Sequence, residues 1–163
     1  RTNGCASGEP APHVGLLSST TRRRNSISTL SSCSCGKFWP REPLAHIATL
    51  EWLMFQMGGF GPIPGQVHHF IALEDEAERR YGLERYMAET RRLYGVMDRR
   101  LAANEYFAGS ELTVADFAIL GWLWRHPRHK VDLADFPNVQ RWYQALMARP
   151  GVQRGFAVPL RRA

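Results

Sequence analysis

The stretch that decides the fold is 112-LTVADFAILGWLW-124, which marks the start of a helix and then fills it with apolar side chains. Thr113 is a natural N-cap, because its hydroxyl can accept a hydrogen bond from a free backbone N–H of the first turn. Asp116 can reach back to the N–H of the cap residue, and its charge suits the positive end of the helix dipole. Nearly every residue from Val114 to Trp124 is apolar, so we expect a helix that is buried on all sides.

Two more helices are predicted before this stretch. Pro43 suits a first helical turn, and the regularity that follows it ends at Gly58 and Gly59. A second pattern predicts a helix from Leu83 to about Ala103. The apolar residues that carry the first pattern at helical spacing are Leu44, Ile47, Leu50, Met54 and Met57.

The last predicted helix lies in "FPNVQRWYQALMARPGV", where it begins after Pro137 and is stopped by Pro150 and Gly151. No run of alternating strand residues follows residue 36, so residues 36–163 are expected to form an all-α domain. Residues 1–35 differ, since they hold eight Ser, four Thr and four Arg but no aromatic residue. Such a composition predicts a disordered or irregular low-complexity tail.

Charge and cysteine content exclude several classes of protein. The net charge is +6, of which half comes from residues 1–35, so residues 36–163 carry no concentrated basic stripe for a nucleic acid. No apolar run is long enough for a membrane span, and no signal peptide is evident, so a cytoplasmic protein is expected. Cys5, Cys33 and Cys35 lack the spacing of a metal site or a comfortable disulfide and are interpreted as free thiols.

The order of these features resembles the C-terminal helical domain of the glutathione transferases over about residues 36–158. "LTVAD" at 112–116 is similar to the folding signature of that superfamily, with "NEYFAG" before it and "FPNVQRW" after it. A narrower resemblance lies in "LEWLMFQMGGFGPIPGQVHHF" at 50–70 and "ERYMAETRRLYGVMDRRL" at 84–101. These runs are similar to the bacterial nu class and its fungal prion-forming relatives.

The resemblance implies a homodimer that binds glutathione as co-substrate, with no other cofactor and no metal, together with a small hydrophobic electrophile or a disulfide. The glycines and prolines of residues 58–65 are then expected to form a loop that re-aims the chain. Trp52, Phe55 and Phe60 can supply an apolar wall for the second substrate. The alternative is that these side chains are core, which we favour for Trp52 and for Met54, whereas Phe60, in the loop, is assigned to the crevice.

Arg92 occupies the position at which such relatives bring an arginine toward the carboxylates of glutathione bound to the partner subunit. A guanidinium suits this role because it stays charged and binds a carboxylate through two parallel hydrogen bonds. The alternative is a solvated helix surface on which Arg92 pairs with Glu89 or Glu84. His68 and His69 point about 100° apart on a helix, so they are not expected to share a metal, and one of them is expected to pack structurally.

The resemblance also implies what residues 1–35 lack. Family members begin with a thioredoxin-like domain that holds the γ-glutamyl end of glutathione and stabilises its thiolate, the reactive nucleophile. The segment "NSISTLSSCSC" does not read as that domain, and an out-of-frame start is one hypothesis for it. Two functions therefore stay open. The first is glutathione-dependent thiol transfer or disulfide and peroxide reduction, weak or absent in this chain alone. The second is a non-catalytic helical module that dimerises or binds a hydrophobic ligand.

Overall fold

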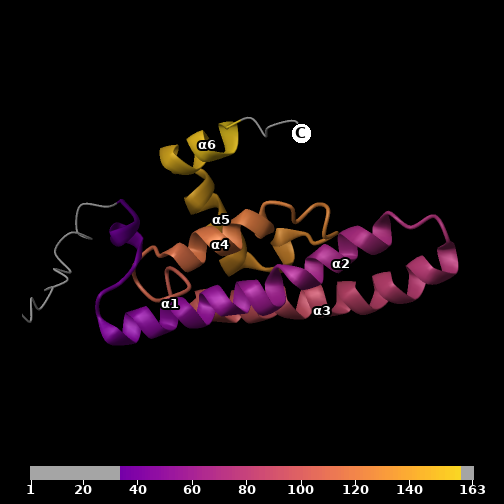
Figure 1. Ribbon diagram of the computed structural model, residues 1–163, viewed down its shortest axis with the longest axis horizontal. Coiled ribbons are helices and arrows are strands. Elements are labelled where there is room, and N and C mark those ends of the chain that lie inside the picture. Colours follow the sequence, from indigo (N-terminus) through magenta and orange to yellow (C-terminus); the bar gives the residue numbers. More distant parts are fainter. Residues whose placement is uncertain (1–33, 159–163) are drawn as a thin grey trace, which may run out of the picture.

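In the computed structural model, which describes residues 34–158, the chain runs out along one helical path and returns along another (Figure 1). α2 packs along α3, and the return helix also reaches α1, where the Arg100 guanidinium lies 5.7 Å from the ring centroid of Trp52. A short 3-10 turn, Ser34–Phe38, precedes these elements. The outward path is α1 (Pro43–Phe55), a π-helical turn (Gln56–Phe60) and α2 (Pro62–Ile71), and the return path is α3 (Glu76–Ala103).

The glycines that follow Met57 do not break the helical path, so the loop expected there is wrong. The chain instead takes one wide turn, closed by a 2.8 Å hydrogen bond from the Gly61 N–H to the Gln56 carbonyl. Gly61 keeps right-handed helical angles (φ −72°), and a Cβ at this position would lie 2.8 Å from the Gln56 side chain. Pro62 then begins α2, where its missing N–H removes no intrahelical hydrogen bond.

α3 begins seven residues before the predicted start at Leu83. Asp75 is its N-cap, and the carboxylate accepts a 2.9 Å hydrogen bond from the Glu78 N–H. The buried face of α3 lies against α2 and the helices that follow, and it consists of Gly82, Thr90, Leu93, Tyr94, Met97 and Leu101.

Three further helices complete the fold: α4 (Val114–Leu123), α5 (Pro137–Met147) and α6 (Pro150–Ala157). The capping box at Thr113 and Asp116 is confirmed, with the Thr113 N–H donating to the Asp116 carboxylate at 2.9 Å. α4 is not buried on all sides, because Trp124 at its C-terminus is 41% exposed. α5 ends at Met147, shortly before Pro150. The helical structure does not stop there, because Pro150 is the first residue of α6, a helix that was not predicted.

The core lies where α3, α4 and α5 meet the π-helical turn. The Asp98 carboxylate of α3 joins two of these elements, because it accepts hydrogen bonds from the Asn138 and Val139 N–H groups at the start of α5, at 2.8 and 3.1 Å. The largest fully buried apolar side chains are Trp142, Tyr94, Phe60, Phe107, Met97, Leu101, Ile119, Leu123 and Leu146.

The described residues bear on the expected absence of strands and of membrane-spanning helices, but not on the predicted N-terminal tail. Within residues 34–158 no β-strand forms and no helix is both long and apolar enough to cross a membrane. The predicted tail at residues 1–35 lies outside the described residues apart from its last two backbone positions, and so do Cys5, Cys33 and the side chain of Cys35.

Candidate functional site

A groove of about 530 Å³ lies between α2 and α3 and presents two arginines. Arg85 and Arg92 are seven residues apart on α3, which places both guanidinium groups on one face of the helix, about two turns from each other. Ile63 of α2 gives the groove an apolar wall. The remaining lining residues are Tyr86, Ala88 and Glu89. Two guanidinium groups beside an apolar wall suit a small ligand that carries carboxylate groups.

Arg92 is held by a carboxylate of its own helix. Its Nε and one terminal nitrogen each donate to a different oxygen of Glu89, both at 2.7 Å. The side-chain hydrogen bond to Arg92 lowers the pKa of Glu89, and the same bond raises the pKa of Arg92. The pairing with Glu89 was one of the two alternatives considered for Arg92. Because the Arg92 side chain is 60% exposed, this pair adds little to stability, and a ligand carboxylate can compete with Glu89 for the same two donors.

Arg85 was missed in the sequence analysis. Its side chain is exposed, and no salt bridge to it occurs within the described part of the chain. The signal that points to it is the seven-residue spacing from Arg92, which only becomes meaningful once both residues lie in one helix beside a groove. Arg85 is therefore the guanidinium of this groove that needs no carboxylate displaced before it binds a ligand.

The predicted aromatic wall is split between the surface and the core. Trp52 and Phe55 are half-buried and their ring centroids lie 5.0 Å apart. Phe60 is fully buried and packs edge-on against Tyr94 at 5.3 Å. Its assignment to an open crevice is corrected, because the side chain has no exposed surface in the single chain. Met54, which was expected in the core, is 55% exposed.

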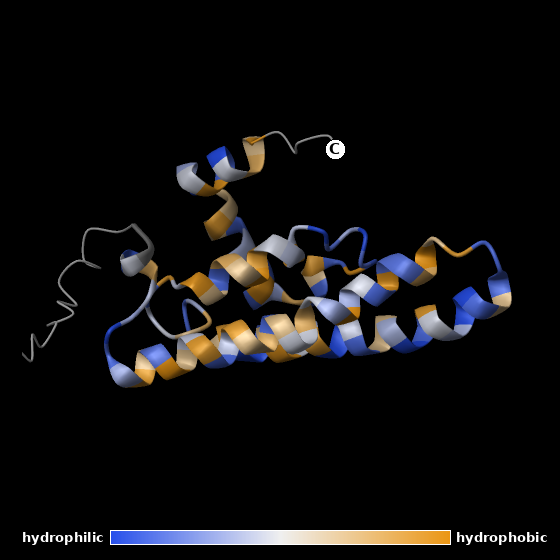
Figure 2. Cartoon of the chain, viewed as in Figure 1, coloured by the Kyte–Doolittle hydropathy of each residue, from blue (hydrophilic) through white to orange (hydrophobic). Residues whose placement is uncertain are grey.

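Met54 belongs to an apolar face that α1 leaves open. We call this the α1 face. Figure 2 shows apolar residues along this helix at the edge of the molecule. A contiguous apolar surface on one helix is typical of an interface with another protein surface. The face consists of Leu44, Ile47, Leu50 and Met54 of α1 and Met57 of the π-helical turn, with exposed fractions of 75%, 52%, 37%, 55% and 60%.

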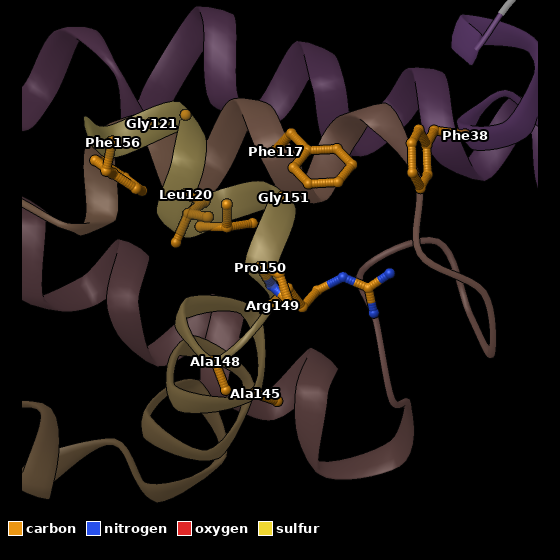
Figure 3. Close-up of a pocket in the computed structure, with 12 residues that line it drawn as sticks. Phe38, Phe117, Leu120, Gly121, Ala145, Ala148, Arg149, Pro150, Gly151 and Phe156 are labelled. Atoms are coloured by element: carbon orange, nitrogen blue, oxygen red, sulfur yellow. The ribbon is translucent and has the colours of Figure 1, made fainter. Parts of the chain in front are cut away.

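A second and larger groove, of about 920 Å³, lies between α4 and α6 (Figure 3). Phe38 and Phe117 form one end of it, with ring centroids 4.9 Å apart in an edge-to-face arrangement. Arg149 is the one charged side chain of the lining, and Figure 3 shows it extending into the same space. The open side of α4 is therefore a wall of this groove. Other apolar lining residues include Leu120, Val152 and Phe156.

The two neighbouring histidines diverge as expected. His69 is exposed and His68 is half-buried, on α2. No group of three or more His, Cys, Asp or Glu side chains that can hold a metal ion occurs between residues 34 and 158.

Comparison with known proteins places these features in a family. Residues 62–150 match the family described as "Glutathione S-transferase, C-terminal domain". The chain is 38% identical over 115 residues to the disulfide-bond oxidoreductase YfcG of Escherichia coli. The match covers 71% of this chain and 53% of that protein. Similar coverage of other relatives means that the chain spans about half the length of the curated proteins it matches.

Solved structures give the same picture. A glutathione transferase from Burkholderia graminis, with two glutathione molecules bound per subunit, superposes with a TM-score of 0.69 at 35% identity and covers 78% of this chain and 55% of its own. A glutathione transferase from Pseudomonas putida, with one glutathione disulfide bound per subunit, gives 0.67 at 36% identity, over 77% and 56% of the two chains. With an all-helical fold and a family match over more than half of its length, the chain belongs to the glutathione S-transferase family and carries that family's C-terminal domain.

Proposed function

We propose that this chain is the helical half of a glutathione-dependent disulfide reductase of the bacterial nu class, the group that also has fungal prion-forming relatives. The similarity to a disulfide-bond oxidoreductase and to a transferase with bound glutathione disulfide supports this reaction over conjugation to an electrophile. Peroxide reduction uses the same thiol chemistry and is the next candidate. The observation that carries the proposal is the groove in which Arg85 and Arg92 stand together on α3.

In this proposal the two arginines bind the carboxylates of a glutathione molecule seated mainly on a partner subunit. Glutathione has two carboxylates at its ends, and each guanidinium can hold one through paired hydrogen bonds. Arg85 is available directly, whereas Arg92 must first leave Glu89. The groove thus selects the tripeptide by charge, and it contributes binding and orientation rather than chemistry.

The chemical step is thiol–disulfide exchange. The thiolate of one glutathione attacks a sulfur of the substrate disulfide, which forms a mixed disulfide and releases one substrate thiolate. A second glutathione thiolate attacks the mixed disulfide, so that glutathione disulfide and the second substrate thiol leave. Two thiols are oxidised and one disulfide is reduced. The groups that stabilise the first thiolate belong, by family resemblance, to a thioredoxin-like domain, and residues 34–158 contain no β-strand of such a domain. We therefore expect weak turnover by the chain alone.

The α1 face supports a homodimer. A second copy can cover it with the same apolar residues, because a two-fold interface pairs one patch with itself. Burial of five apolar side chains that are now exposed by a third or more provides the driving force at roughly 25 cal/mol per Å². In the proposed dimer, the arginine groove of one subunit faces the glutathione bound to the other. A cytoplasmic location fits a reaction that consumes reduced thiols.

Calorimetric titration of the full chain with glutathione and with glutathione disulfide tests the binding proposal. We expect Arg85→Gln and Arg92→Gln each to weaken binding by roughly 10- to 100-fold, as for loss of a hydrogen bond between charged groups. Arg91→Gln is the matched control, because Arg91 pairs with Asp135 at 2.8 Å and does not line the groove. Unchanged affinity in both groove variants, or no binding of either compound to the full chain at millimolar concentration, contradicts the proposal.

The groove between α4 and α6 favours a second function, binding of an apolar ligand with an anionic head. Its lining is aromatic and aliphatic around one guanidinium, that of Arg149. A fluorescent fatty-acid analogue added to the chain is expected to bind with an emission increase. Arg149→Gln should reduce its affinity and leave that of the matching uncharged alcohol unchanged. Equal effects on both probes exclude a role of Arg149 in recognising the anionic head.

A further inference from the structure

His129 is fully buried at a junction of three elements and takes no part in either groove. It belongs to residues 124–131, a run of turns between α4 and the 3-10 turn Leu133–Asp135, which we call the turn segment. The Tyr94 hydroxyl of α3 lies 3.0 Å from His129 Nδ1, and the buried ring of Phe60 lies edge-on to the imidazole at 6.4 Å. The turn segment is thus anchored to the core by the His129 imidazole, by the buried Val131 side chain and by His126, which packs edge-on against Tyr143 of α5 at 5.7 Å.

The other side of this imidazole faces His68 of α2. The two ring centroids are 4.9 Å apart and the rings are inclined by 30°, so they stack. The Nε2 atom of each ring is buried and has no hydrogen-bond partner within the described residues. Since ring lone pairs lie in the ring planes, near-parallel stacked rings do not converge on a single metal ion. The pair is therefore built for two neutral rings in contact.

The fixed charges around the pair, the guanidinium groups of Arg125 and Arg128, are both positive. Arg125, His126 and Arg128 of the turn segment act on the two imidazoles, and Tyr94 is the titratable group that α3 presents. α4 presents the uncharged ring of Trp122, which stacks with His68 at 6.3 Å. No acidic side chain is paired with either imidazole in residues 34–158. A proton added to the Nε2 atom of either ring in the closed pair would have neither water nor a counter-charge to stabilise it.

We propose that His68 and His129 form an acid-sensitive latch, which holds the turn segment against α2 while both rings are neutral and releases it when one ring takes up a proton. The turn segment is the part that moves, because His68 and Tyr94 belong to regular helices whereas the turn segment is short and irregular. Lys130 of the turn segment has φ +54°, a left-handed conformation that is strained for a residue with a side chain. Opening of the turn segment relieves this strain. The inference is independent of glutathione binding.

The direction of the pH effect follows from linkage. Burial lowers the pKa of His129 to about 3 in the closed state, and the Arg125 guanidinium lowers it further. Burial likewise lowers the pKa of His68, with Arg128 and Arg125 adding to the effect. An exposed histidine titrates near 6.5. Between about pH 6.5 and 3 the open state therefore binds a proton that the closed state does not bind. The latch is stable above pH 6.5 and weakens below it. For uptake of one proton, the equilibrium constant for opening rises about fivefold between pH 6.5 and 5.5 and about tenfold over the next pH unit.

Hydrogen exchange read by mass spectrometry on the full chain tests the latch. After correction for the intrinsic pH dependence of exchange, amides of the turn segment are expected to lose about fivefold in protection between pH 6.5 and 5.5, while amides of α5 lose less. His129→Gln keeps a polar group near Tyr94 and should abolish the pH dependence. His69→Gln, on the exposed neighbour of His68, should retain it.

Two results overturn the proposal. One is an equal loss of protection in the turn segment and in α5, which means that acid unfolds the whole domain. The other is a turn segment in His129→Gln that retains the wild-type pH dependence. If His129→Gln does not fold, the comparison of the turn segment with α5 in the unmodified chain decides, because opening of the latch leaves α5 protected whereas unfolding of the domain does not. Since no measurement uses glutathione, failure of the latch leaves the proposed reductase function untouched.

Discussion

The Asp116 carboxylate of α4 accepts a hydrogen bond from the indole nitrogen of Trp142 on α5 at 3.0 Å, and both side chains are buried. The same carboxylate accepts bonds from the Thr113 N–H at 2.9 Å, from the Thr113 hydroxyl at 3.0 Å and from the Phe107 N–H at 3.1 Å. One side chain thus fixes the start of α4, the loop before it and the neighbouring helix. Burial raises the pKa of Asp116, and these donors oppose that effect.

Replacing Asp116 is therefore expected to be among the most damaging single changes. Asp116→Ala leaves four buried donor groups without this acceptor, so the free energy of unfolding should fall by about 3–5 kcal/mol, as for removal of one partner from a buried charged network. Asp116→Asn keeps one acceptor oxygen and should cost less. Urea unfolding measures both, with Asp135→Asn as a surface control. A loss below about 1 kcal/mol for Asp116→Ala contradicts the assigned role.

Two glycines of α3 make a matched pair for close packing. A Cβ on Gly82 would lie 2.1 Å from the ring of Phe70, whereas a Cβ on Gly95 would meet only the end of the Arg99 side chain at 3.6 Å. Gly82→Ala should destabilise the protein by about 1–3 kcal/mol through overpacking between α2 and α3. Gly95→Ala should stabilise it by about 0.5–1 kcal/mol, since alanine favours helix. Equal shifts in the urea midpoint of the two variants would show that α2 is not so close to α3 at Gly82.

The features that the sequence predicts well depend on neighbouring residues. The capping box of Thr113 and Asp116 predicts the first residue of α4 correctly, because its hydrogen bonds span only three residues. The N-cap of α3 was open to the same reasoning, with Asp75 and Glu78 three residues apart. The predicted start of α3, at Leu83, is seven residues late because the apolar pattern becomes regular only from that residue onward.

The features that were missed depend on distant or alternative packing. A Gly-Gly pair commonly ends a helix, but here a π-helical turn and Pro62 at the start of α2 continue the helical path. His129 meets Tyr94, 35 residues earlier, and nothing local indicates that contact. The α1 face has the spacing of a buried stripe, yet a single described chain leaves it open. Periodicity predicts which residues share a face and says nothing of which molecule covers it.

The α1 face should determine the oligomeric state. Ile47→Glu and Met54→Lys each place a charge on an apolar surface, at positions that are 52% and 55% exposed in the single chain, so neither should disturb the fold of that chain. If a second copy covers the face, each variant buries an unpaired charge in the dimer and shifts the chain toward monomer.

Size-exclusion chromatography with light scattering measures the effect over a range of concentrations. Glu51→Lys, on an exposed position of the same helix outside the α1 face, is the control and should behave as the unmodified chain. A clean monomer of the unmodified chain at high concentration would argue against the homodimer.

The pair of Glu89 and Arg92 makes a prediction about ligand affinity that differs from the effect of removing an arginine. In the free chain Glu89 occupies the donors that a ligand carboxylate would use, at 2.7 Å for both bonds. Glu89→Gln removes the competing charge, so affinity for glutathione should rise. An exposed ion pair of this kind is worth about 0.2–1 kcal/mol, which corresponds to at most about a 5-fold gain.

Acid should not produce the same gain at moderate pH. Because the hydrogen bond to Arg92 lowers the pKa of Glu89, the carboxylate stays ionised and keeps competing as the pH falls from 8 to 5. Titration calorimetry of the unmodified chain and of Glu89→Gln at both pH values measures the difference. Glu84→Gln is the matched control, since Glu84 is exposed on the same helix and does not line the groove. If Glu89→Gln weakens binding, Glu89 positions Arg92 for the ligand instead of competing with it, and the groove needs the pair intact.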